Sequence, residues 1–312
     1  MKAGIKILYL SMIAGWFLVS CASSHKAYLF TSFHEPATDG LRMLYSYDGY
    51  RWTDINQVFI KPEVGIQKVM RDPSMIQGPD GIFRLVWTSD WSGGNGFGYA
   101  SSKDLIHWSK EVYVPVMNQE PTVVNVWAPE LFYDEATRQY IIVWASCIPN
   151  RFPKGIEDEN NNHRLYYTTT TDFVSFTETK LFYDPGFSSI DAQIVKLTKN
   201  KYVLVVKDNT RLQRNIKVAF ASSPLGPYSA ASAAFTESFT EGPAVTKVKG
   251  NQYLIYYDAY REKKYGARKT SDFIHFTDAS KEIEVPQGHK HGTILRVSRQ
   301  TLKKLLTTEN NK

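Results

Sequence analysis

The apolar positions of this chain fall into short runs that are separated by Gly, Asp, Asn or Pro. Helical periodicity is scarce, whereas short runs rich in Val, Ile, Tyr and Phe are typical of β-strands. The pattern therefore predicts an all-β protein. The clearest predicted strands cover residues 28–33, 83–88, 140–145, 202–206 and 253–257.

One short phrase follows these strands five times: small hydroxyl residues, usually an aspartate, and an aromatic residue a few positions later. The aspartate suits an Asx-turn, and the aromatic residue suits packing between neighbouring sheets. A repeat of about 50 residues fits one four-stranded propeller blade, so the sequence predicts five blades; an open β-sandwich does not explain five matched phrases. The phrases end at Trp52, Trp108, Phe176, Tyr228 and Phe276, with Pro224 replacing aspartate in the fourth.

The first phrase lacks the long upstream strand that the other four possess. A similar apolar segment, residues 292–297, occurs at the C-terminal end instead. We expect this strand to complete the first blade and close a five-bladed β-propeller, because closure removes open sheet edges. A short helix over residues 300–307 is predicted to follow.

Composition supports one large folded domain. Of 312 residues, 43% are hydrophobic and 14% are aromatic, which supplies a large core. Two cysteines exclude a disulfide-stapled scaffold and a multi-cysteine zinc site. The formal net charge is +6, and the basic residues form no cluster with interleaved aromatics, so a nucleic-acid partner is not expected. We expect a monomer.

The first twenty residues have the pattern of a secretory leader: two lysines, then an apolar run too short to span a bilayer comfortably. The run ends at Cys21 in a sequence that resembles the bacterial lipobox, which implies lipidation of Cys21, a tether over residues 21–26 and a propeller domain over 27–312. Ala22 rather than Asp after the cysteine resembles lipoproteins of the Gram-negative outer membrane. An ordinary signal peptide is the alternative.

Three acidic residues stand at or just before the start of a predicted inner strand: Asp72 before 73–76, Asp191 before 193–197 and Glu241 before 244–248. Inner strands of a propeller begin at the same mouth of the central channel. Polar residues of the two remaining blades, within 127–131 and 289–293, occupy similar positions. The fold thus predicts that all five blades contribute polar side chains to one pocket.

At these residues the chain resembles glycoside hydrolase family 43, the five-bladed propeller enzymes that act on arabinose-, xylose- and galactofuranose-containing polysaccharides. The resemblance covers roughly residues 27–298. Asp72 in Asp-Pro resembles the family's general base, Asp191 the auxiliary acid that orients the proton donor, and Glu241 in Glu-Gly-Pro the general acid. Ala192 stands where many members have proline, which places the sugar specificity in doubt.

Glycoside hydrolysis gives an independent reason for such a set, because it needs one carboxylic acid to protonate the leaving oxygen and one carboxylate to activate water or attack. The resemblance implies inversion of configuration. Taken singly, each acid has a structural explanation: Asp72 in a turn, Asp191 as a cap for a backbone amide, and Glu241 in a solvated loop. Their shared position in the repeat favours the catalytic interpretation.

Four further residues are candidates for sugar contacts. Trp91 and Trp127 are suited to stacking on a sugar face or, alternatively, to packing between blades. Arg268 is a candidate for a substrate hydroxyl or for Glu241, with a surface role as the alternative. His291 resembles a histidine near the channel centre in the family, which is sometimes associated with a calcium or sodium ion; a core histidine is the alternative. No cofactor is expected to be required.

The expected function is hydrolysis of a terminal arabinofuranosyl, galactofuranosyl or xylosyl residue from a plant or microbial polysaccharide. A propeller fructosidase is disfavoured by the absence of a Trp-Met-Asn-Asp-Pro opening, and a phosphorylase by the absence of a basic cluster for phosphate. A non-catalytic carbohydrate-binding propeller is the third alternative, and retention of all three acids argues against it.

Overall fold

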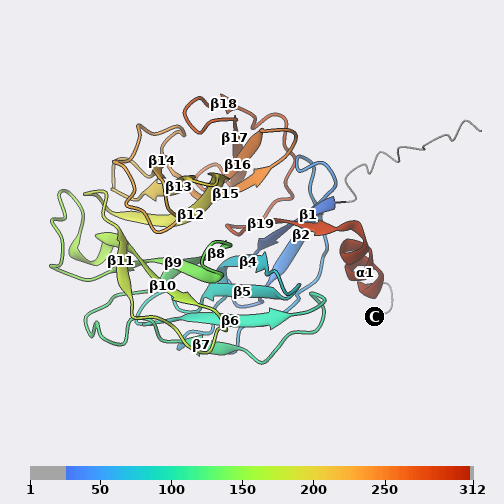
Figure 1. The fold of residues 1–312 in the computed structure, drawn as a ribbon, viewed down its shortest axis with the longest axis horizontal. Coiled ribbons are helices and arrows are strands. Elements are labelled where there is room, and N and C mark those ends of the chain that lie inside the picture. Colours follow the sequence, from blue (N-terminus) through green and yellow to red (C-terminus); the bar gives the residue numbers. More distant parts are fainter. Residues whose placement is uncertain (1–25, 310–312) are drawn as a thin grey trace, which may run out of the picture.

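The computed structural model describes residues 26–309, which form five antiparallel sheets around one central axis (Figure 1). This arrangement is a five-bladed β-propeller, as the repeat predicts. We number the blades 1 to 5 in the order of the repeated phrases. None of the helices formed by the described residues is long and apolar enough to cross a membrane. The predicted leader and Cys21 lie outside these residues.

The strands of each blade are given from the axis outward. Blade 1 contains β19 (Ile294–Ser298), β1 (Lys26–Ser32), β2 (Arg42–Ser46) and β3 (Thr53–Asp54). Blade 2 contains β4 (Arg71–Gln77), β5 (Phe83–Thr88), β6 (Phe97–Ser102) and β7 (Val112–Val114). Blade 3 contains β8 (Trp127–Asp134), β9 (Gln139–Cys147), β10 (His163–Thr170) and β11 (Lys180–Tyr183).

The remaining two blades differ in size. Blade 4 contains β12 (Ser189–Thr198), β13 (Lys201–Asp208) and β14 (Asn215–Ala221). Blade 5 contains β15 (Thr240–Lys247), β16 (Tyr253–Ala259), β17 (Lys264–Thr270) and β18 (Thr277–Asp278). The described helices are the 3-10 turn η1 (Glu159–Asn161) and α1 (Arg299–Glu309).

The C-terminal strand closes the ring as expected. β19 pairs antiparallel with β1, so Leu295 faces Leu29 and Val297 faces Ala27 across the strands. The helix α1 follows at once, and its Leu302 joins the apolar cluster between blades 1 and 2. Because β19 and β1 share one sheet, blade 1 gains its innermost strand only when the ring closes.

The repeated phrase forms the same hydrogen-bonded turn in four blades. In blade 3, the Asp172 carboxylate accepts the backbone N–H groups of Val174 and Ser175 at 2.9 Å each. The Thr170 hydroxyl accepts the N–H of Phe173, whose φ is 59°. This is the expected Asx-turn, and it explains why aspartate follows a hydroxyl residue at a fixed spacing.

Blade 4 has three strands rather than the expected four among the described residues. Here Pro224 replaces the aspartate. The segment after β14 still donates to it, from Ser229 to the Phe220 carbonyl and from Ser232 to the Val218 carbonyl. These donors are three residues apart while their acceptors are two apart, so the pairing does not continue as a regular ladder.

The core is divided among the five blade boundaries. Five apolar clusters each join two neighbouring blades, with tightly buried side chains such as Trp87 and Trp144. Each cluster contains the aromatic residue of one repeated phrase, which confirms the predicted packing role. The aromatic residues are Trp108 (blades 1 and 2), Phe176 (2 and 3), Tyr228 (3 and 4), Phe276 (4 and 5) and Trp52 (5 and 1).

Candidate active site

Four of the five inner strands carry a β-bulge near their first residue. In β4, β8, β12 and β15 the cross-strand register skips two residues, and the first skipped residue has a positive φ. A bulge re-aims a side chain relative to the regular strand, and left-handed backbone at residues other than glycine often marks functional positions. The residues are Asp72 (φ 50°), Ala128 (46°), Asp191 (51°) and Gly242 (59°).

Glu241 does not share this position. It pairs across the strand with Asp258 and precedes the bulge by one residue, as Arg71 does in blade 2. The expectation that all three acids occupy one position in the repeat is therefore wrong for Glu241, because Gly242 takes the bulged position in β15. The glutamate side chain is one methylene longer than aspartate, and it lines the same pocket as Asp72 and Asp191.

The structure brings the three predicted acids together at one mouth of the central channel. They line a pocket with a volume of about 90 Å³, to which Trp91, Trp127 and His291 also contribute. This space is small beside the roughly 300–1,000 Å³ of pockets that hold drug-sized ligands, so it favours one sugar ring over a chain. The other lining residues are Phe33, Glu35, Arg71, Ile190, Asp258 and Lys290.

Asp72 is held by two side chains. Its carboxylate accepts a hydrogen bond from the Thr88 hydroxyl at 2.9 Å and lies 3.2 Å from the Nδ1 atom of His291. Burial acts to raise the pKa of Asp72, but the hydrogen bond and positive charge of His291, together with Arg71, hold the pKa below its ordinary value. Asp72 is therefore an ionised carboxylate at neutral pH.

Asp191 and Glu241 are linked through the backbone of β15. One carboxylate oxygen of Asp191 accepts the N–H of Gly242 at 3.1 Å, and Lys207 donates to Glu241 Oε2 at 2.8 Å. Burial raises the pKa of Asp191, and the negative charges of Glu241 and Asp72 add to that effect. The pKa of Asp191 is thus raised, whereas the pKa of Asp72 is lowered.

His291 fits between the base and acid candidates. At Gly242 an added Cβ would lie 2.5 Å from His291 Cγ, so the imidazole packs directly on the glycine of Glu-Gly-Pro. Burial lowers the pKa of His291, but its hydrogen bond to Asp72 and the charge of Asp191 outweigh burial and raise the pKa to about 9. His291 therefore carries a positive charge that connects Asp72 with the Glu241 segment.

The resemblance implied that a calcium or sodium ion is sometimes associated with His291. Within residues 26–309, no group of three or more His, Cys, Asp or Glu side chains is arranged to hold a metal ion. Calcium takes six to eight oxygen ligands, and waters can be among them. A calcium or sodium ion near His291 therefore stays a prediction.

One wall of the pocket is a stack of flat side chains. Trp91 stacks on Trp127 at 4.5 Å between ring centroids, and Trp127 stacks on His163 at 4.8 Å. The Arg71 guanidinium lies 4.7 Å from the Trp91 ring and binds both carboxylate oxygens of Glu35 at 2.9 Å. Trp127 is thus committed to protein contacts, whereas Trp91, which is 52% exposed, has surface left for a sugar.

Arg268 does not reach the pocket. It lies on β17, where its guanidinium donates to Glu237 at 2.6 Å and to Asp278 at 2.7 Å. β17 is the third strand outward from the axis in blade 5. The expectation that Arg268 contacts substrate or Glu241 is therefore wrong, because strand order places it near the perimeter of the ring.

Replacing Arg268 with Ala is expected to leave kcat and KM for any hydrolysed glycoside within about twofold of the parent. The two ion pairs are partly exposed, so their loss should reduce the free energy of unfolding by about 1 kcal/mol or less. Steady-state kinetics and urea denaturation check both statements. A tenfold loss of kcat/KM in a stable variant would contradict the placement.

Sequence reasoning missed three charged residues at the site. Lys207 is 3% exposed and stands next to the last residue of β13, and a lysine directly after four buried aliphatic residues was the available signal. Lys290 and Asp258 form a 2.7 Å ion pair beside Glu241. No local pattern identifies this pair, because the two residues come from different blades.

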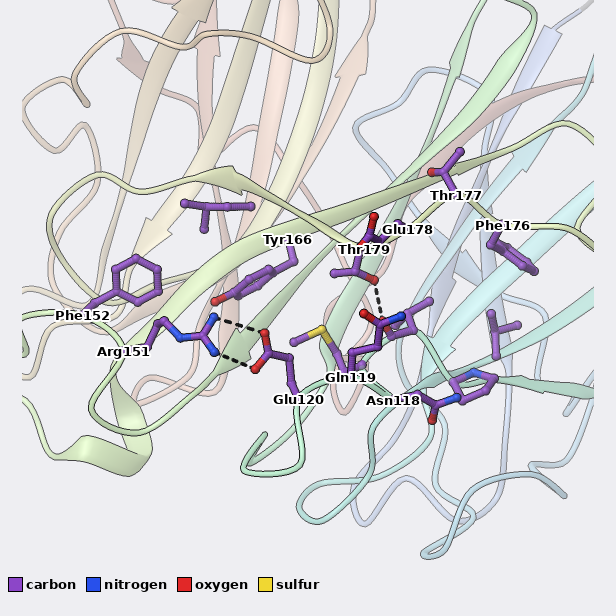
Figure 2. A pocket seen from close by; sticks show the side chains of 15 residues that line it. Asn118, Gln119, Glu120, Arg151, Phe152, Tyr166, Phe176, Thr177, Glu178 and Thr179 are labelled. Atoms are coloured by element: carbon purple, nitrogen blue, oxygen red, sulfur yellow. Dashed lines mark hydrogen bonds and ion pairs between the residues drawn. The ribbon is translucent and has the colours of Figure 1, made fainter.

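A larger pocket lies at the perimeter, on the boundary of blades 2 and 3 (Figure 2). It has a volume of about 730 Å³, and a two-pronged ion pair between Arg151 and Glu120 crosses it, with distances of 3.1 and 2.7 Å. None of the three bulge-associated acids lines it. The smaller axial pocket is therefore the candidate active site.

Known proteins match both the sequence and the fold. An α-L-arabinofuranosidase from Bifidobacterium longum subsp. longum is 27% identical over 105 residues, which is 31% of this chain and 10% of that protein. An endo-arabinase structure from Bacteroides thetaiotaomicron has a TM-score of 0.60 at 14% identity, covering 81% of this chain and 92% of that one. An α-L-arabinofuranosidase from Clostridium thermocellum has a TM-score of 0.58 at 15% identity, covering 81% and 89%.

The two structural likenesses establish the shared propeller fold. Family membership comes from a different comparison: the sequence profile of a family described as a probable glycosyl hydrolase domain, related to glycoside hydrolase family 43, matches residues 23–303. That range includes all five blades. The chain therefore belongs to this family of probable glycosyl hydrolase domains, which is related to glycoside hydrolase family 43.

Proposed function

We propose that this protein is a glycosidase that removes a terminal α-L-arabinofuranosyl residue from a polysaccharide or oligosaccharide, in a single step with inversion. The observation that carries the proposal is the convergence of Asp72, Asp191 and Glu241 on one pocket sized for a single sugar ring. The names of the matched proteins favour arabinose, whereas terminal galactofuranose and xylose are the other candidates. A pocket, in contrast to an open groove, favours terminal cleavage.

In this proposal Asp72 acts as the general base. Its ionised carboxylate takes a proton from the water that attacks the anomeric carbon. Thr88 and His291 hold the carboxylate in place, and the positive charge of His291 keeps it ionised between turnovers. Trp91 and Arg71 form the wall against which the sugar ring would rest.

Glu241 acts as the general acid. Lys207 binds its Oε2 atom, so the proton for the leaving oxygen would be carried on Oε1. Asp191 positions this segment through its hydrogen bond from the Gly242 N–H, which fixes the backbone next to Glu241.

The experiment is a panel of 4-nitrophenyl furanosides and pyranosides, with the product anomer followed by proton NMR. We expect the α-L-arabinofuranoside to be the best substrate and the first product to be the β-anomer. Accumulation of the α-anomer would exclude the inverting mechanism. Hydrolysis of no glycoside, together with retained binding of an arabino-oligosaccharide, would instead favour the carbohydrate-binding propeller.

Lipidation of Cys21 and attachment to the outer membrane stay predictions. They fit an enzyme that meets polysaccharide at the cell surface. The monomeric state also stays a prediction.

A further inference from the structure

The helix α1 lies at the edge of blade 1, where the described part of the chain also begins (Figure 1). Lys26, the first residue of β1, pairs across the sheet with Ser298, and α1 follows at once with Arg299. The predicted lipidation site, Cys21, stands five residues before Lys26. Such a segment spans at most about 18 Å, so a lipid on Cys21 would hold a membrane surface within reach of α1.

One face of α1 is packed against the propeller and the other is exposed. Leu302 and Leu305 are each 1% exposed and belong to the apolar cluster between blades 1 and 2. The opposite face carries the exposed Arg299, Lys303 and Lys304, and the described side chains of the helix include no acid. The helix is therefore firmly packed on one side and positively charged on the other.

Arg299 and Lys303 share a solvent-exposed groove with Tyr47. The groove has a volume of about 530 Å³, and Leu306 and Thr307 complete its lining. Tyr47 is 56% exposed, and its ring centroid lies 5.4 Å from Cζ of Arg299. Two cations and an aromatic ring with a polar tip are thus presented together to the solvent.

The positive charge of this groove is not balanced by a neighbouring acid. Neither Arg299 nor Lys303 forms an ion pair with a described residue. Asp48, the acid nearest to the groove in sequence, accepts two backbone N–H groups of its own turn at 2.7 and 2.9 Å. Because Arg299 and Lys303 are four residues apart on one helix, their like charges repel each other. An anion bound between them would relieve that repulsion.

An anionic phospholipid surface matches this combination of groups. Lysine and arginine beside a membrane are attracted to acidic headgroups, and tyrosine side chains favour the boundary between membrane and water. A few charges bind such a surface weakly by themselves. Attachment through Cys21 would make the contact intramolecular, so that weak interactions are enough to hold α1 on the membrane.

We propose that α1 and Tyr47 dock on anionic phospholipid headgroups when the chain is anchored through Cys21. The inference rests on the predicted lipidation and goes beyond the proposed function, because it concerns how the protein is oriented. β1 begins beside α1 at Lys26, and Phe33, just after the other end of β1, lines the axial pocket. Docking through α1 therefore turns the mouth of the candidate active site away from the membrane.

The test measures how fast single lysines are acetylated in the full chain, recovered with its own anchor and placed in phosphatidylcholine vesicles with or without phosphatidylglycerol. Mass spectrometry gives the rate for each lysine. With phosphatidylglycerol present, we expect Lys303 to react about 3- to 10-fold more slowly. The difference should vanish in about 1 M salt, where the screening length is about 3 Å. Lys180 in blade 3 and Lys263 between β16 and β17 are exposed, and their rates should not change.

A charge reversal separates docking from simple closeness to the membrane. Arg299→Glu places an acid four residues before Lys303, which favours the helix but removes the positive groove, so phosphatidylglycerol should no longer slow acetylation of Lys303. The matched control is Arg138→Glu, which makes the same charge change at an exposed position between β8 and β9 and should leave the effect in place. Equal behaviour of the two variants would overturn the inference, as would a Lys303 rate that ignores phosphatidylglycerol in the parent.

Two further readouts on the same preparation keep this inference apart from the other proposals. Mass spectrometry of the N-terminal peptide shows whether Cys21 carries lipid, and an unmodified Cys21 would overturn the anchored arrangement together with the docking of α1. Hydrolysis of the glycoside panel tests the proposed function, and its failure would leave the acetylation result unchanged.

Discussion

Replacing Glu241 with Gln is expected to lower kcat on arabinotriose by a factor of about 10² to 10⁴, the usual contribution of a general acid. The loss on 4-nitrophenyl α-L-arabinofuranoside should be much smaller, because nitrophenolate leaves as a stable anion without a proton. Asp72→Asn is expected to lower kcat by a similar factor of about 10² to 10⁴ on both substrates, since water activation is required whatever the leaving group. The two acids are therefore distinguished by leaving-group dependence.

Steady-state kinetics of the two variants on the two substrates provide this comparison. Both substitutions replace a carboxylate by an amide of nearly the same shape, so thermal melts should confirm that the fold is kept. Arg268→Ala serves as an unaffected control. If Glu241→Gln loses equal activity on both substrates, the residue is not the proton donor, and if Asp72→Asn spares either substrate, Asp72 is not the base.

Glu130 is expected to make the protein less stable as the pH rises. Its side chain lies on β8, is 9% exposed, and accepts a hydrogen bond from the Thr293 hydroxyl at 3.1 Å. Burial raises its pKa to about 7, although Ser74, the charge of His291 and Thr293 oppose the rise. Below pH 4.5 the folded and unfolded chains both hold the proton. As the pH rises, the unfolded chain releases it first, so stability decreases until the pH exceeds 7.

The Glu130→Gln variant isolates this effect, because the amide oxygen can still accept from Thr293 and carries no charge. Between pH 5.5 and 8.5, the free energy of unfolding of the parent should fall by about 2 kcal/mol more than that of the variant, given the pKa of about 7. Urea denaturation at the two pH values measures the difference. Glu135→Gln, at an exposed position, should behave as the parent does, and parallel pH curves for parent and Glu130→Gln would refute the expectation.

The propeller fold could be predicted because short sequence motifs specify its turns and its packing between blades. Four of the five repeated phrases build their own turn, as where Asp172 and Thr170 accept backbone N–H groups within five residues. The aromatic residue of each phrase then has one natural place, between neighbouring blades. Closure by β19 could be predicted from the number of strands, because blade 1 lacked an inner strand and an unassigned strand remained near the C-terminal end.

The details of the site depended on register. Asp72 and Asp191 lie within a β-bulge, whereas Glu241 stands one residue before the bulge of its strand. A difference of one residue leaves no signal in composition or spacing. The prediction for Arg268 was wrong because of strand order. Its position in the third strand of blade 5 places it near the perimeter, where it pairs with Glu237 and Asp278. The Lys207–Glu241 pair joins blades 4 and 5 and has no local signal.

By itself, then, the sequence determined the number of blades, the closure of the ring and the meeting of three acids in one pocket, because turns, apolar runs and the residues that start inner strands act over short segments. Only the tertiary structure decided which residues pair with those acids, which charged groups surround them and which side chains form the walls of their pocket. Lys207, Arg71 and Asp258 belong to blades 4, 2 and 5, whereas Lys290 and His291 precede β19 of blade 1. Their ion pairs and hydrogen bonds depend on distances that only the packed ring sets.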